Sequence, residues 1–141
     1  MKLTIEQLRS ISETLQCGEI CFIHKFDGKL ESYPIDIDDY MDDENPWEET
    51  IEKVDNNRED YIELRPMESR DSYKVMEAYA ESFSSENLQQ ELFKALYNSK
   101  PFGRFKHIID NSGAFRQKWF DFKNDHYIQW VRQCIEMMEE E

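Results

Sequence analysis

Hydrophobic residues near the start of the chain repeat with the period of a helix. The repeating positions are Ile5, Leu8, Ile11 and Leu15. Thr4 and Gln7 form a capping-box pattern at the beginning of this stretch, and Leu3 can pack on Leu8. Gly18 is a plausible stop. The pattern therefore predicts a helix over about residues 4–16.

A β-hairpin is predicted next, because two extended runs flank Asp27-Gly28, a dipeptide typical of a two-residue type I′ turn. If Phe26 faces Lys29 across this turn, then His24 lies opposite Glu31. One face of the hairpin should then meet the core through Ile20, Phe22, Phe26, Tyr33 and Ile35. The His24–Glu31 pair is open to two interpretations, an acid–base pair or, as we favour, a cross-strand charge pair.

The middle of the chain adds a short helix and a third strand. Asn45 as the cap and Pro46 as the first residue predict a helix over about residues 46–54. Its inward positions are expected to be Trp47, Ile51 and Val54. The alternation in residues 61–65 predicts a strand that ends before a Pro and has Ile62 and Leu64 facing inward.

From residue 68 onward the pattern is helical. Two helices are expected first. The inward stripe of one is at Tyr73, Met76, Tyr79 (or Ala80) and Phe83, and that of the other is at Leu88, Leu92, Ala95 and Leu96. Lys100-Pro101 breaks the second of them. A short helix then ends near Asn111, and Ser112-Gly113 opens a final long helix. Its stripe is expected at Phe115, Trp119, Phe122, His126, Trp130, Cys134 and Met137 (or Met138).

These elements together predict an α+β fold. We expect a single domain over residues 1–141, in which a small antiparallel sheet of about three strands packs against an N-terminal helix and a C-terminal cluster of helices. Residues 1–65 would supply the first helix, the hairpin, an acidic loop and the third strand. Residues 66–141 would supply the helical part.

The charge of the chain is strongly negative and unevenly distributed. Among 141 residues, 31 are acidic and 17 are basic, for a net charge of −14. Residues 31–63 hold fourteen acidic and two basic residues. Such acidity disfavours indiscriminate binding to nucleic acid. No apolar run approaches the ~18 residues of a membrane helix, and the first residues have no signal core. We therefore expect a cytoplasmic protein with no membrane association.

Residues 100–123 contrast with this acidity. They include five Phe and one Trp, with six basic and two acidic residues. The aromatic residues expected in the core, by their helical spacing, are Phe102, Phe105, Phe115, Trp119 and Phe122, whereas Phe120 lies off this stripe. Most basic residues alternate outward. The candidates for binding an anion or another ligand are Arg104, Lys106, His107, Arg116 and Lys118.

Motifs for metals, cofactors and catalysis are weak. Cys17, Cys21 and His24 lie close in sequence, but zinc sites usually have four ligands and no second paired motif follows. The acidic run after Asp36 lacks the Gly and Glu that an EF-hand loop requires. There is no Gly-rich phosphate loop and no nucleophile motif. We therefore predict no metal, no cofactor and no catalytic residue, and a protein that is more readily explained as a non-enzyme.

The second half resembles a known family through motifs that occur in the same order. The first two are a Pro-acid-Ser segment at Pro66, Glu68 and Ser69, and a Ser-Tyr-x-x-Met helix at Ser72, Tyr73 and Met76. The other two are a Phe-x-Arg-Phe-Lys run at Phe102, Arg104, Phe105 and Lys106, and a Trp-x-x-Phe helix at Trp119 and Phe122. Over about residues 61–131 the chain is similar to the bacterial uncharacterised protein family number 0158 of the UPF series. Gly103 stands where that family often has a second Arg, and His107 where it often has an acid. The resemblance implies a shared fold and names no activity, substrate or cofactor.

The pattern supports several hypotheses about function. The first is a non-catalytic, protein-binding or regulatory module whose acidic surface attracts another protein, with candidate residues Asp38, Asp39, Asp42 and Asp43. The alternative is binding of an anion, a nucleotide or single-stranded nucleic acid through residues 100–123. A third hypothesis is enzymatic use of Arg104, Lys106 and His107 on a phosphorylated small molecule. The pattern predicts no oligomeric state.

Overall fold

The computed structural model describes residues 2–36, 46–83 and 86–139. They form two compact units. The sheet unit consists of Met1–Pro66 with Tyr127–Glu141, and the helical unit is Met67–His126. Helices and a three-stranded antiparallel sheet confirm the predicted α+β class. That the whole chain is one domain stays a prediction.

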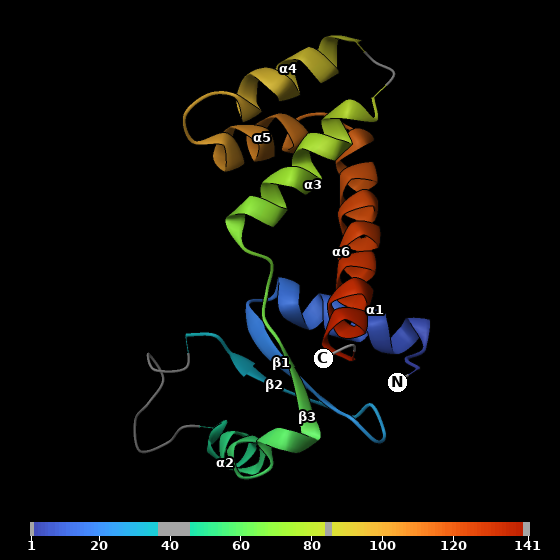
Figure 1. The fold of residues 1–141 in the computed structure, drawn as a ribbon. Coiled ribbons are helices and arrows are strands. Elements are labelled where there is room, and N and C mark those ends of the chain that lie inside the picture. Colours follow the sequence, from blue (N-terminus) through green and yellow to red (C-terminus); the bar gives the residue numbers. More distant parts are fainter. Residues whose placement is uncertain (1, 37–45, 84–85, 140–141) are drawn as a thin grey trace. The chain divides into compact units, whose positions relative to one another are not determined.

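The sheet unit is built on three strands in the order β2-β1-β3 (Figure 1). Its elements are α1 (Ile5–Gln16), β1 (Glu19–His24), β2 (Leu30–Pro34), α2 (Glu48–Asn56), the 3-10 turn η2 (Arg58–Asp60) and β3 (Tyr61–Leu64). Both neighbours of β1 run antiparallel to it. The first helix and the third strand therefore form close to where the sequence pattern predicts them.

The central strand β1 is buried on both faces, because helices of the sheet unit lie on either side of the sheet (Figure 1). On one face Ile20 and Phe22 join Tyr33 and the α2 residue Val54 in a buried cluster. On the other face Cys21 pairs with Leu64 and Ile23 with Ile62, and all four side chains are buried. A strand that is buried on both faces has a continuous apolar run rather than an alternating one.

The beginning of α1 is fixed by its cap. Thr4 Oγ1 accepts a hydrogen bond from the Gln7 backbone N–H, and Gln7 Oε1 accepts one from the Thr4 N–H, which confirms the capping box. Gly28 of the hairpin loop lies against this cap. A Cβ at Gly28 would come within 2.7 Å of Gln7 Nε2, and its φ of +72° also favours glycine.

The predicted two-residue turn of the hairpin is wrong. The His24 N–H donates to Lys29 O, and residues 25–28 form the loop between these two positions. Asp27 Oδ1 accepts a hydrogen bond from the Lys29 N–H, which stabilises the longer loop. Glu31 consequently lies opposite Phe22 instead of His24. The register is shifted by two residues, which leaves each side chain on its expected face.

Two hairpin residues expected in the core are exposed in this register. Phe26 lies in the loop and is 86% exposed, and Ile35 lies beyond the end of β2 and is 48% exposed. The predicted start of the second helix is also wrong, because α2 begins at Glu48 with Trp47 as its N-cap. Its inward face is as predicted: Val54 is buried, with Trp47 and Ile51 packed beside it.

The helical unit contains α3 (Ser69–Glu81), α4 (Glu86–Leu96), α5 (Pro101–Asp110) and the first half of α6 (Phe115–Glu139). Its buried cluster consists of Met76, Tyr79, Ala80, Leu92, Leu96, Phe105 and Ile109. Partly buried residues packed on this cluster include Tyr73, Phe83, Leu88, Trp119 and Phe122. The stripes expected for α3 and α4 are therefore confirmed, as is the end of α5 near Asn111.

The stripe predicted for α6 holds only for its first half. The buried side chains of the second half are Tyr127, Val131 and Ile135, whereas Met137 is 68% exposed. Successive helical residues are about 100° apart, so the stripe through Trp119 and Phe122 and the stripe through Val131 occupy different faces of α6. Each half of the helix thus contributes its own stripe to the unit in which it lies.

The hairpin provides a matched test of the observed register. We expect Phe22→Ala to lower the free energy of unfolding by about 3–5 kcal/mol, because it leaves a cavity in the core. We expect Phe26→Ala to change it by less than about 0.5 kcal/mol, because the ring is exposed. Urea denaturation followed by circular dichroism measures both. Comparable losses in the two variants would contradict this register.

Candidate functional site

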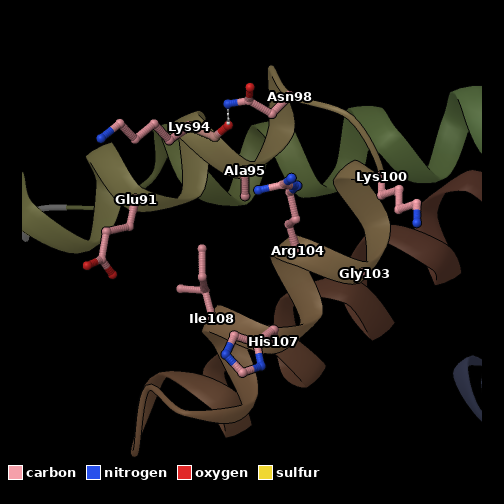
Figure 2. Close-up of a pocket in the computed structure, with 9 residues that line it drawn as sticks. All are labelled: Glu91, Lys94, Ala95, Asn98, Lys100, Gly103, Arg104, His107 and Ile108. Atoms are coloured by element: carbon pink, nitrogen blue, oxygen red, sulfur yellow. Dashed lines mark hydrogen bonds between the residues drawn. The ribbon is translucent and has the colours of Figure 1, made fainter.

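The α4–α5 groove is an open hollow in the helical unit, with a volume of about 660 Å³. Figure 2 shows that side chains of both helices surround it. The lining residues are Glu91, Lys94, Ala95 and Asn98 of α4 and its C-terminal end, Lys100 of the connecting loop, and Gly103, Arg104, His107 and Ile108 of α5. A volume of this size falls in the range of about 300–1,000 Å³ that is usual for small-molecule sites.

Helical periodicity explains why these residues share the groove. Glu91, Lys94, Ala95 and Asn98 follow i, i+3, i+4 and i+7 spacing, which places them on one face. The α5 residues Gly103 and His107 are likewise four positions apart. Gly103 leaves open space in the groove, since a Cβ there would meet no atom within 4 Å.

Lys100 turns the chain from α4 into α5. Its φ of +52° and ψ of +53° are left-handed, and it is the one non-glycine residue with positive φ in the described part of the chain. Pro101 follows as the first residue of α5. A left-handed conformation costs about 1–2 kcal/mol for a residue with a Cβ. The basic side chain at this end of the groove is therefore held on a strained backbone.

Arg104 has unused hydrogen-bonding capacity in the groove. Its Nε donates to the Ser99 carbonyl oxygen at 2.7 Å, which ties the side chain to the loop. Its terminal amino groups have no ion pair or hydrogen bond with any residue in the described ranges. Figure 2 shows the guanidinium group between α4 and α5, beside Ala95. Such a planar group can bind a carboxylate or phosphate through two parallel hydrogen bonds.

The charge of the groove is predominantly positive. Lys94, Lys100 and Arg104 line it together with a single carboxylate, Glu91. Ala95 and Ile108 add an apolar surface between these charges. The arrangement can hold an anionic group and still contact an apolar body attached to it.

The structure brings together only some of the predicted ligand-binding residues. Arg104 and His107 both line the groove, but Lys106 does not. Arg116 forms an ion pair with Asp110 at 3.2 Å, and its guanidinium carbon lies 4.8 Å from the Phe120 ring centre. Lys118 lies over the Phe115 ring at 5.2 Å. Lys106, Arg116 and Lys118 are exposed surface residues outside the groove.

Of the five aromatic residues of the 100–123 stretch that were predicted for the core, Phe105, Trp119 and Phe122 belong to it or pack on it. Phe105 is 1% exposed, and its ring meets the edge of Trp119 with 4.9 Å between ring centres. Phe102 contradicts the prediction, because it is 42% exposed. It occupies a face of α5 about 160° from that of Arg104, and it does not line the groove.

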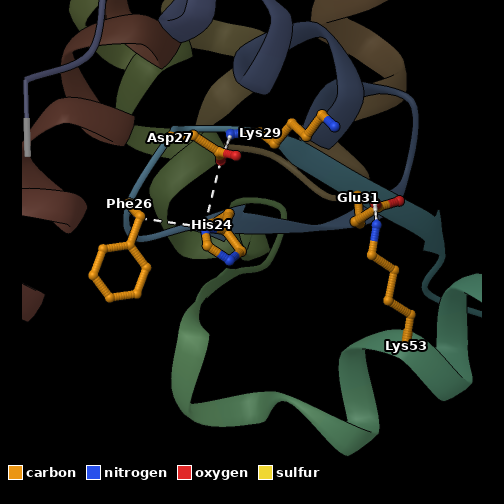
Figure 3. A network of polar contacts seen from close by, with 6 residues as sticks. All are labelled: His24, Phe26, Asp27, Lys29, Glu31 and Lys53. Atoms are coloured by element: carbon orange, nitrogen blue, oxygen red, sulfur yellow. Dashed lines mark hydrogen bonds and ion pairs between the residues drawn. The ribbon is translucent and has the colours of Figure 1, made fainter.

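The hairpin carries a separate polar network (Figure 3). Lys53 Nζ binds Glu31 Oε1 at 2.7 Å, whereas His24 Nδ1 lies 3.4 Å from Asp27 Oδ1. The expected His24–Glu31 pair is therefore wrong in either interpretation, because the register separates the two residues. The acidic candidates Asp38, Asp39, Asp42 and Asp43 lie outside the described residues.

Cys17 and Cys21 of the sheet unit lie in different environments. Cys21 is buried, and its burial raises the pKa of the thiol to about 12, so the metal-binding thiolate is disfavoured. Cys17 is exposed. Over the ranges described, no three His, Cys, Asp or Glu side chains are grouped closely enough to hold a metal ion.

A sequence model described as "Uncharacterised protein family (UPF0158)" matches residues 3–140, nearly the whole chain. The chain belongs to UPF0158. No curated protein and no solved structure matches it significantly. No helix in the described part of this UPF0158 member is long and apolar enough to cross a membrane.

Of the nine residues that line the groove in this UPF0158 member, only Arg104 and His107 are among the site residues predicted from the sequence. The α4 residues Glu91, Lys94 and Asn98 have helical spacing that places them on one face with Ala95. That spacing is visible in the sequence, but it is also the ordinary pattern of a solvated helix face. Only the packing of α4 beside α5 makes this face one wall of a groove.

Replacing Lys100 tests the strained connection. We expect Lys100→Gly to raise the free energy of unfolding by about 0.5–1 kcal/mol, because glycine adopts a positive φ without the steric cost of a Cβ. We expect Lys106→Gly, inside α5, to lower it by about 1 kcal/mol. Urea denaturation measures both variants. Destabilisation by Lys100→Gly would show that its backbone is not strained.

Proposed function

We propose that this UPF0158 member is a cytoplasmic, non-catalytic protein that binds a small anionic molecule in the α4–α5 groove. The observation that carries the proposal is Arg104, whose terminal amino groups have no partner among the described residues and which lies in a hollow beside Lys100. Carboxylate and phosphate are the groups that an arginine binds most effectively. The ordered Nε–Ser99 hydrogen bond reduces the entropy that the side chain loses on binding.

The shape of the groove favours a small molecule over a nucleic-acid strand. Proteins that bind single strands stack bases on aromatic side chains along a basic track. No Phe, Tyr or Trp is among the described residues that line the groove, and Phe102 lies on another face of α5. Lys106, Arg116 and Lys118 would supply such a track, but none of them lines the groove.

The lining residues also favour binding over catalysis. The lining residues that the structure describes include no Ser, Thr or Cys that could act as a nucleophile. His107 is the one histidine among them, and it has no carboxylate partner in the described part of the chain. A general base normally has such a partner to orient its ring. In this proposal the groove therefore binds an anion and catalyses no reaction.

Titration with inorganic phosphate at low ionic strength tests this proposal. We expect saturable binding with a dissociation constant of about 1 mM, equivalent to about −4 kcal/mol, and weakening with salt. Amide chemical shifts in NMR spectra would locate the binding at α4 and α5. We expect Arg104→Gln to weaken binding about tenfold, because it removes the charged fork.

Two further variants control for indirect effects. Gly103→Leu keeps every charge but places a side chain in the open space of the groove, so it should also weaken binding. Lys106→Gln removes a positive charge from the same helix outside the groove and should change the affinity less than twofold. The absence of phosphate-dependent shifts at low salt, or equal effects of Arg104→Gln and Lys106→Gln, would refute the proposal.

We also propose, as a second function, that the acidic middle of the chain binds another protein. The described part of this segment supports it through Glu48, Glu49 and Glu52 of α2, which are exposed and form no ion pair with another described residue. Uncompensated carboxylates of this kind increase the association rate with a basic partner and select against acidic ones.

Charge neutralisation tests the second proposal. Replacing Glu48, Glu49 and Glu52 by Gln should reduce salt-sensitive capture of a partner from a lysate. The control replaces Glu6, Glu13 and Glu81, which are also exposed, so the net charge changes equally. Equal capture by the two triple variants would count against this surface.

A further inference from the structure

The two ends of the α4–α5 groove carry different groups. Lys100 lies at one end, where α5 begins, and Glu91 and Lys94 lie at the other end (Figure 2). Between the two ends, the Arg104 side chain lies beside Ala95 (Figure 2). The Ile108 side chain points into the hollow (Figure 2). A ligand whose anionic group contacts Arg104 and Lys100 therefore extends over an apolar surface before it reaches Glu91 and Lys94.

The far end of the groove offers one acceptor and one donor. Glu91 and Lys94 are three positions apart on α4, and both are exposed. They form no ion pair with each other, and neither forms one with any other residue that the structure describes. A carboxylate only accepts hydrogen bonds, and an ammonium group only donates them. A ligand group that reaches this end meets both kinds of partner.

The opposite charges at this end give a charged ligand tail little net attraction. A positive tail is attracted by Glu91 and repelled by Lys94, and a negative tail experiences the reverse. Because the two interactions are similar in size near a solvated surface, they nearly cancel. A neutral group with a donor and an acceptor, such as a carboxamide, can form a charge-assisted hydrogen bond with each residue.

We infer that the ligand is a bipolar molecule, with a phosphate or carboxylate at Arg104 and Lys100, a short apolar spacer over Ala95 and Ile108, and a neutral amide-like tail at Glu91 and Lys94. This inference rests on the proposed function of the groove in binding an anion. It adds the class of ligand, because it specifies the group at the end remote from the anion.

A matched set of phosphate monoesters on a propyl spacer tests the inference. The tails are methyl in butyl phosphate, carboxamide in 4-(phosphonooxy)butanamide, ammonium in 3-aminopropyl phosphate and carboxylate in 4-(phosphonooxy)butanoate. Calorimetry or NMR titration gives the affinity of each compound for the full chain. We expect the carboxamide to bind about two- to tenfold more tightly than the methyl compound, as one or two added hydrogen bonds would provide.

Substitutions at the far end should change the preference in opposite directions. Glu91→Gln removes the negative charge, so it should favour the carboxylate tail over the ammonium tail. Lys94→Gln should favour the ammonium tail instead. Glu86→Gln is the matched control, because Glu86 is exposed at the start of α4 and does not line the groove. It should leave the order of the tails unchanged.

The outcomes separate this inference from the proposed function. If butyl phosphate binds but the carboxamide gains nothing, or if Glu91→Gln and Lys94→Gln shift the preference in the same direction, the inference is overturned and anion binding stands. If no compound of the set binds, both are overturned. Tighter binding of the carboxamide with opposite shifts in the two variants supports the inference.

Discussion

Burial of Phe105 determines how the basic residues of α5 are distributed. Its side chain is enclosed in the core of the helical unit, with its ring against Trp119. Consecutive residues of a helix are about 100° apart. Once Phe105 faces inward, Arg104 and Lys106 must therefore lie on opposite sides of the buried face. Arg104 enters the groove beside α4, and Lys106 faces solvent.

The loop between α4 and α5 completes the site by placing the basic residue Lys100 at one end of the groove. Pro101 begins α5 and cannot donate a backbone hydrogen bond, and Lys100 adopts a left-handed conformation to turn the chain before it. The Arg104 Nε–Ser99 O hydrogen bond then joins the helix to the loop. Strained residues are often found at binding sites, where the surrounding structure compensates for their cost.

The hairpin shows why a correct pattern can still give a wrong pairing. A shift of two residues moves no side chain to the other face, since the period of a strand is two. Hydrophobic alternation therefore cannot distinguish the predicted register from the observed one. The observed register is instead stabilised by the Asp27–Lys29 hydrogen bond in the loop and by Gly28 packing on the cap of α1. These contacts join residues that the alternation of the hairpin does not relate to one another.

The sequence by itself determined the α+β class, the capping box of α1, the inward residues of β3, α3 and α4, and the family. These features depend on local periodicity and on short motifs, which can be observed in the chain alone. Tertiary structure decided the register of the hairpin, the change of buried face along α6, and the division of the basic residues near Phe105. Each of these depends on which of several compatible faces meets a neighbouring element. The α4–α5 groove belongs to the same class, because residues from two helices become one site only when the helices pack side by side.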